Sequence, residues 1–142
     1  MGSINLIDTI KKTKLKNIPL NDGNVLHGLK SNETNFAGFG EVYFSKINYN
    51  SIKSWKRHSI MIMNLIVPLG EVKFVFCDKK KETFREEIIG EEKYYRLTVP
   101  PNIWFGFKGL FNPYSLIMNV SNIEHDPNEV ENQRNNFIDY KW

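Results

Sequence analysis

Turn-forming residues divide this chain into short segments, and no segment shows the sustained apolar period of a helix. Glycine, proline and asparagine stand between runs rich in Val, Ile, Phe, Tyr and Met, which is typical of short β-strands bounded by turns. The expected strands are Glu41–Ile47, Ser59–Val67, Glu71–Cys77, Tyr95–Val99 and Ser115–Val120. Many short strands at regular spacing predict an all-β sandwich or barrel.

The two ends of the chain show different patterns. Residues 6–16 fit a short helix, and Asp126 followed by Pro127 is typical of a helix start. The length of 142 residues is that of one domain. Because no repeat, linker or low-complexity tract divides the chain, we expect a single domain over residues 1–142.

Composition narrows the class of partner. The apolar fraction of 41% and the charged fraction of 25% fit a soluble globular protein. The net charge of +3 suits an anionic small ligand and falls short of the concentrated basic patch of a nucleic-acid binder. Cys77 is the single cysteine, and the longest apolar stretch, Ile60–Leu69, is too short for a bilayer. With no secretory leader pattern, we expect a cytoplasmic protein without nucleic-acid or membrane partners.

One of the three histidines lies next to a group of basic residues. His58 follows the cations Lys53, Lys56 and Arg57 and directly precedes an apolar strand. At the mouth of a barrel, its imidazole could take a proton at neutral pH, and the cations could hold phosphate oxygens or an oxyanion. On composition alone, a basic surface turn with an incidental histidine is the commoner explanation.

A metal centre is not expected. A metal site in a β-barrel usually needs two or three histidines and a carboxylate. Residues 59–68 contain no His, Glu, Asp or Cys, and His27 and His125 fit loop positions. Motifs for a P-loop, a dinucleotide fold, a nucleophile elbow or a zincin are also absent from the sequence.

An aromatic cluster is the second notable feature. In the segment 103–107, alternation places Trp104 on one face of a strand and Phe105 with Phe107 on the other. One set can pack in the core while the other lines a cavity where a sugar or base stacks. We expect Trp104 and Phe105 to bind substrate, although core packing alone commonly explains such clusters.

Five segments together resemble a known family. They are the lysine-led run ending in His58 and residues 65–72, 97–107, 126–129 and 138–142. Over roughly residues 20–142 the chain resembles the dTDP-4-dehydrorhamnose 3,5-epimerase family of cupins. The resemblance implies a β-jelly-roll barrel that forms a homodimer, a nucleotide-linked 4-keto-6-deoxyhexose as substrate, no metal or organic cofactor, and a place in deoxysugar or surface polysaccharide biosynthesis.

The resemblance also implies roles for residues. His58 matches the histidine base of the family, and Lys53, or its neighbours Lys56 and Arg57, would replace the arginine that binds substrate. Glu41 and Ser45 fall where the family has polar residues that contact substrate.

Other positions depart from the family pattern. Asn119 stands at the position of the catalytic tyrosine, and an amide is not a proton acid at neutral pH. Phe105 replaces the histidine of a His-Gly-Phe motif. The acidic residue that orients the base is expected at Asn135 or Asp139, between which the sequence does not choose.

Two alternatives remain open. The sugar-nucleotide 3,4-ketoisomerases carry a related histidine motif with a glycine twelve residues later, a spacing that His58 and Gly70 reproduce. The chain could also be a non-catalytic binder of nucleotide sugars, as the replacements at Asn119 and Phe105 would allow. The C-terminal Asp-Pro-Asn-Glu and Trp142 favour the epimerase.

Overall fold

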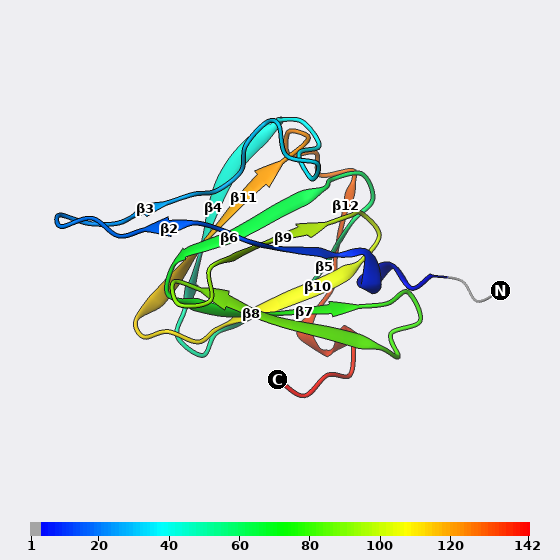
Figure 1. The fold of residues 1–142 in the computed structure, drawn as a ribbon. Coiled ribbons are helices and arrows are strands. Elements are labelled where there is room, and N and C mark those ends of the chain that lie inside the picture. The colour runs from blue at the N-terminus through cyan, green and yellow to red at the C-terminus, as the bar shows by residue number, and fades with distance from the viewer. Residues whose placement is uncertain (1–3) are drawn as a thin grey trace.

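A computed structural model describes residues 4–142, and it is built from two facing antiparallel sheets (Figure 1). The first sheet has the order β1 (Lys11–Lys14), β9 (Tyr95–Val99), β6 (Met63–Leu69), β11 (Tyr114–Ser121) and β4 (Glu41–Asn48). The second sheet has the order β12 (Val130–Asn132), β5 (Ile52–His58), β10 (Trp104–Gly109), β7 (Glu71–Cys77) and β8 (Phe84–Gly90). The predicted all-β jelly-roll fold is confirmed.

Three smaller elements complete the described chain. The strands β2 (Asn17–Ile18) and β3 (Val25–Leu26) pair into an arm that projects from the body of the molecule (Figure 1). The 3-10 helices η1 (Leu6–Thr9) and η2 (Asn135–Phe137) lie near the two ends. Among residues 4–142, no helix has both the length and the apolar character needed to span a bilayer.

The predicted helical ends are largely wrong. Only η1 is helical within residues 6–16, because the chain extends at Ile10 and pairs with β9 from Lys11 onwards. Asp126 does not start a helix. Its carboxylate instead accepts the backbone N–H of Asn128 in a turn, 2.9 Å away, and the chain then enters strand β12.

The predicted strands that are apolar or alternating correspond to observed ones. β7 and β9 match the predicted ranges, and β4 and β11 extend them by one residue at one or both ends. β6 starts at Met63 rather than at Ser59, because the backbone bends there and the N–H groups of Ile60 and Met61 bond a side chain instead of a strand. Gly70, at a φ of 87°, makes the tight turn from β6 to β7.

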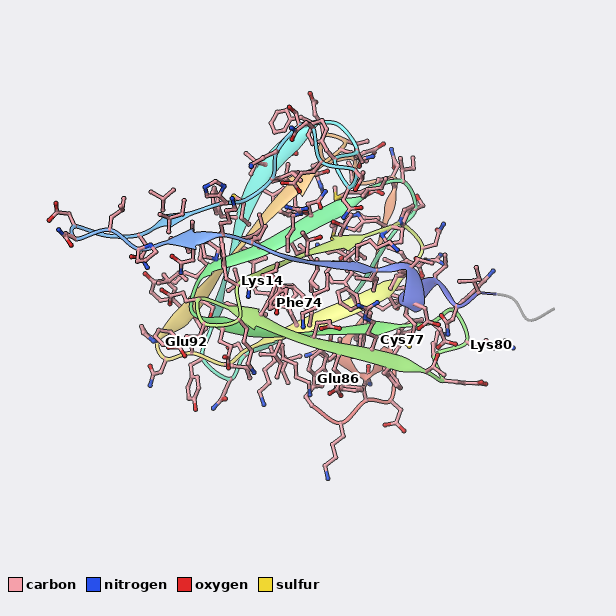
Figure 2. The ribbon with its side chains drawn as sticks, viewed as in Figure 1. Lys14, Phe74, Cys77, Lys80, Glu86 and Glu92 are labelled. Carbon is pink, nitrogen blue, oxygen red and sulfur yellow. The ribbon has the colours of Figure 1, made fainter. Side chains whose placement is uncertain are left out.

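Apolar side chains fill the space between the sheets. Phe74 and Phe76 of β7 are fully buried and stack with ring centroids 6.3 Å apart. Phe74, labelled in Figure 2, lies between the two sheets and belongs to the same core cluster as Leu65 and Ile117 of the first sheet. Since each fully buried residue of this size contributes roughly 1.5–3 kcal/mol, this core fixes the spacing of the sheets and therefore of any cavity between them.

The outer face of the second sheet is covered by the C-terminal segment (Figure 1). Trp55 of β5 and Trp104 of β10 point to this face and pack against Phe137, Tyr140 and Trp142. This packing places η2, which is part of the C-terminal segment, next to β5, where the Trp55 ring donates a hydrogen bond to the carbonyl of Asn135.

Candidate active site

A cavity of about 380 Å³ lies between the two sheets and is lined by residues of β4 and β11 from the first sheet and of β5 and β10 from the second, among others. Its deep wall is apolar and comes from the core, with Leu65, Phe74 and Ile117. Its outer wall is polar and includes Ser54, the exposed side chains of Lys53 and Lys56, and Asn132, Gln133 and Asn135 near the C-terminus. The size and the mixture of wall types suit a small polar organic ligand.

His58 and Glu129 form a buried pair behind Phe105, which lines this cavity, and neither residue of the pair is itself part of the lining. Each residue is only 4% exposed, and Nδ1 of His58 contacts Oε1 of Glu129. The other carboxylate oxygen accepts the backbone N–H groups of Ile60 and Met61 at 3.0 and 3.1 Å. Strand β12 pairs with β5 so that Val130 lies opposite His58, and this register brings Glu129 to the imidazole.

The pair fixes the tautomer of the imidazole. Because the Glu129 carboxylate can only accept, Nδ1 of His58 donates and Nε2 carries the lone pair. Nε2 is buried and has no hydrogen-bond partner among residues 4–142. The ring of His58 stacks with that of Phe105, which lines the cavity, at a centroid distance of 6.0 Å. A buried imidazole with an unused lone pair beside a cavity is a candidate general base.

Burial and the pairing set the charges of both groups. Desolvation lowers the pKa of His58 below 6.5, against an opposing contribution from Glu129. For Glu129, burial alone would raise the pKa, but the hydrogen bonds from His58, Ile60 and Met61 outweigh it and hold the pKa below its ordinary value. At pH 7 the imidazole is therefore neutral and the carboxylate is ionised, as a base and its orienting group require.

The lowered pKa of His58 predicts a pH-dependent stability. Below pH 6.5 the unfolded chain takes up a proton at this histidine that the folded protein does not bind, so the free energy of unfolding falls as the pH falls. The slope due to His58 is at most about 1.4 kcal/mol per pH unit. Urea titrations at pH 7 and pH 5.5 would measure it, and His58→Asn should remove this part. A wild-type stability that rises on acidification would contradict the assignment.

Tyr43 and Asn119 form a second polar pair, across the cavity from β5. They are directly opposite one another on β4 and β11 and both line the cavity. Nδ2 of Asn119 donates to the hydroxyl of Tyr43 over 2.9 Å, and Oδ1 of Asn119 accepts the backbone N–H of Asn64 over 3.1 Å. Burial raises the pKa of Tyr43, so the phenol keeps its proton at neutral pH.

The predicted cations divide between two faces of β5. Lys53 and Lys56 line the cavity, and Nζ of Lys53 donates to the backbone carbonyl of Lys46. The pKa of Lys56 is lowered by burial and by the charge of Lys53. Arg57 points to the outer face, where it pairs with Glu131 at 3.0 Å and lies 5.3 Å from the ring of Trp104. The predicted substrate contacts of Arg57 and Trp104 are therefore wrong, because both side chains pack on the outer face of the second sheet.

The other residues predicted to belong to the site lie partly inside the cavity and partly outside it. Ser45 and Phe105 line the cavity, whereas Glu41 accepts the backbone N–H of His125 at 2.8 Å outside it. Asp139 is exposed. The prediction that Asn135 or Asp139 orients the imidazole is wrong, since Glu129 makes that contact.

Sequence reasoning missed Glu129 and Tyr43. Glu129 follows the Asp-Pro pair that is typical of a helix start, and nothing in this local pattern indicates that its carboxylate would contact His58. Tyr43 had a usable signal, because it lies two residues before Ser45 and alternation places both on the same face of β4. Within the described residues, no three His, Cys, Asp or Glu side chains are grouped so as to hold a metal ion.

Two facing antiparallel sheets with a cavity between them place the protein in the cupin class of jelly rolls. The solved structure of a dTDP sugar isomerase from Desulfovibrio desulfuricans G20 is 30% identical, with a TM-score of 0.90, over 99% of this chain and 95% of that one. The chain belongs to this dTDP-sugar isomerase family of cupins, which confirms the family predicted from the sequence.

More distant solved structures share the fold. A dTDP-4-dehydrorhamnose 3,5-epimerase from Sulfolobus tokodaii is 21% identical with a TM-score of 0.78, over 92% of this chain and 80% of that one. A mutant 3,4-ketoisomerase from Thermoanaerobacterium thermosaccharolyticum, in complex with TDP-4-keto-6-deoxyglucose, is 14% identical with a TM-score of 0.73, over 86% of each chain. No protein-family model matches the chain, and neither does any curated protein.

Proposed function

We propose that this protein is a sugar-nucleotide epimerase that removes a proton next to the ketone of a nucleotide-linked 4-keto-6-deoxyhexose. The observation that carries the proposal is the buried His58–Glu129 pair, which leaves the imidazole with a free lone pair and stacks it on Phe105 of the cavity wall. The 30% identity to a dTDP sugar isomerase over nearly the whole chain supports the substrate class.

The proposed chemistry follows from the acidity of carbons beside a ketone. Nε2 of His58 accepts the proton, and the electron pair of the broken C–H bond moves into the carbonyl to give an enolate. An ammonium group such as that of Lys53 or Lys56 stabilises the enolate oxygen or holds the diphosphate. Return of a proton to the opposite face of the carbon inverts its configuration. Ser45 and Phe105 line the space in which the sugar would lie.

Solvent isotope exchange tests the proposal. The protein is incubated with dTDP-4-keto-6-deoxyglucose in D₂O, and we expect deuterium beside the ketone, together with a product of inverted configuration in the NMR spectrum. A product whose carbonyl has moved to C3 would identify a 3,4-ketoisomerase instead. Tight binding in calorimetry without any exchange would identify a non-catalytic binder, and both results would overturn the epimerase.

Replacing Glu129 with glutamine should lower activity by roughly 10²–10³-fold. The amide has one acceptor where the carboxylate has two, so it cannot accept from the imidazole and from the Ile60 and Met61 backbone together. If its NH₂ group faces His58 instead, Nε2 carries the proton and the base is lost. Steady-state rates against pH measure the effect.

The pH profile and a matched control sharpen this prediction. Loss of the carboxylate charge lowers the pKa of His58 further, so the acidic limb of the rate profile moves to lower pH. Glu131→Gln, on the neighbouring strand β12, removes only the half-exposed pair with Arg57 and should leave the rate within twofold. Equal rates for wild type and Glu129→Gln would contradict the orienting role.

We further propose that residues 1–142 act as one domain in the cytoplasm, in deoxysugar or surface polysaccharide biosynthesis.

We also propose that two copies of the chain form a homodimer. Val42 and Phe44 on the outer face of edge strand β4 are 42% and 57% exposed, and a second copy would cover them. Phe44→Lys should halve the mass measured by light scattering. The matched variant Phe111→Lys, in an exposed turn, should leave the mass unchanged, and a monomeric wild type would contradict the dimer.

A further inference from the structure

The proposed reaction needs an acid as well as a base. Inversion requires that a proton reach the face of the carbon opposite the one it left, and His58 can serve only one face. Asn119 stands at the position that the family resemblance gives to a tyrosine, and an amide does not release a proton at neutral pH. The other groups that can donate a proton into the cavity are Tyr43, Lys53 and Lys56.

Position separates these three groups. Lys53 and Lys56 lie on β5, the strand that carries His58, and both side chains are exposed. Tyr43 lies on β4, which belongs to the other sheet. Tyr43 therefore lines the cavity from the first sheet, and His58 lies behind Phe105 on the second sheet, so the two groups can approach a sugar carbon between the sheets from different sheets.

The contacts of Tyr43 leave its proton free to be given away. Its oxygen accepts from Nδ2 of Asn119, whose amide cannot turn over without losing the bond from the Asn64 backbone to Oδ1. The hydroxyl hydrogen has only a weak sulfur acceptor in Met61, 3.9 Å away. The same Asn119 bond would stabilise the phenolate left after the proton is transferred.

We propose that Tyr43 is the general acid of this site and that Asn119 is the residue that positions it. Tyr43 lies directly opposite Asn119 on the neighbouring strand, and the Asn119 amide holds the phenol by a hydrogen bond. The inference rests on the proposed function, because the acid acts on the enolate that His58 generates.

The proton balance closes without a co-reactant. His58 takes the proton from the carbon beside the ketone and becomes an imidazolium. The enolate then takes the phenolic proton on its opposite face, which forms the new C–H bond and leaves Tyr43 as a phenolate. Water removes the proton from the imidazolium and restores the phenol, so no net proton is gained or lost in the cycle.

Tyr43→Phe separates the two half-reactions. We expect deuterium exchange into recovered substrate to persist within about tenfold of wild type, because His58 can return a solvent proton to the same face. Formation of the inverted product should fall by roughly 10²-fold or more. Tyr49→Phe is the matched control, since Tyr49 lies just beyond the same strand, half exposed and outside the cavity lining, and should leave both rates unchanged.

A second variant tests the position of the phenol. Tyr43→Phe combined with Asn119→Tyr places a phenol on β11. We expect this double variant to form the inverted product at least tenfold faster than Tyr43→Phe alone. Unchanged inversion in Tyr43→Phe would overturn the proposal, and so would an equal loss of exchange and inversion in a folded variant with an unchanged melting temperature. If the wild-type protein exchanges no deuterium, the proposed function itself fails. If the wild type exchanges deuterium and Tyr43→Phe inverts the sugar normally, only the role of Tyr43 fails.

Discussion

Asparagine in place of His58 is expected to lower solvent deuterium exchange into a 4-keto sugar nucleotide by roughly 10⁴-fold. The variant loses the only buried imidazole of the described chain, and with it the lone pair beside the cavity. The side-chain amide of asparagine can still donate to the Glu129 carboxylate, so the buried charge keeps a partner and the fold should survive. Mass spectrometry of the recovered nucleotide sugar gives the rate.

The matched control for this variant is His27→Asn. His27 lies on the segment after β3 and outside the cavity lining, and its hydrogen bonds to Lys16 and Tyr94 are made by its backbone. This substitution should leave exchange within twofold of wild type. Exchange by His58→Asn within tenfold of wild type would show that another group removes the proton and would refute the assignment of the base.

The apolar strands could be predicted because the pattern of apolar residues along each strand directly indicates which side chains are buried. In β7, Val72, Phe74 and Phe76 alternate with other residues and all three are fully buried between the sheets. Strand β5 could not be predicted, since its run of lysine, serine and arginine is typical of a solvated loop. It is a strand because it pairs with β10 and β12 and because Trp55 is buried under a segment about 80 residues later in the chain.

Site residues could be predicted where the alternation of side chains along a single strand sets the face on which each one lies. Ser45 and Asn119 line the cavity because alternation along β4 and β11 places them there. Lys53 also lines it, although its strand could not be predicted and only its place near His58 and the family resemblance pointed to it. Glu129 reaches His58 only through the register of β12 on β5, a pairing between segments 71 residues apart. Tyr43 gains its partner in the same way, from the register of β4 on β11. Such contacts depend on strand pairing that no local pattern encodes.

Replacing Trp55 with alanine is expected to lower the free energy of unfolding by about 3–5 kcal/mol. Trp55 is 1% exposed, its ring packs against Tyr140 and Trp142 at centroid distances of 6.3 and 5.5 Å, and its Nε1 donates to the carbonyl of Asn135. Alanine leaves a large void, and both the aromatic contacts and the bond to η2 are lost. Urea unfolding followed by circular dichroism measures the change.

The loss should also reach the cavity, because Asn135 forms part of its wall and is held by Ser54 and by the ring of Trp55. Without that ring the C-terminal segment has less to pack against, so substrate binding should weaken even at temperatures where the variant is folded. Trp142→Ala removes a half-buried ring from the same cluster and leaves the Asn135 bond in place, so its effect on both measurements should be smaller. A loss below 1 kcal/mol for Trp55→Ala would mean that the C-terminal segment does not stabilise the second sheet. The cavity wall at Asn135 would then have to be held by Ser54 alone.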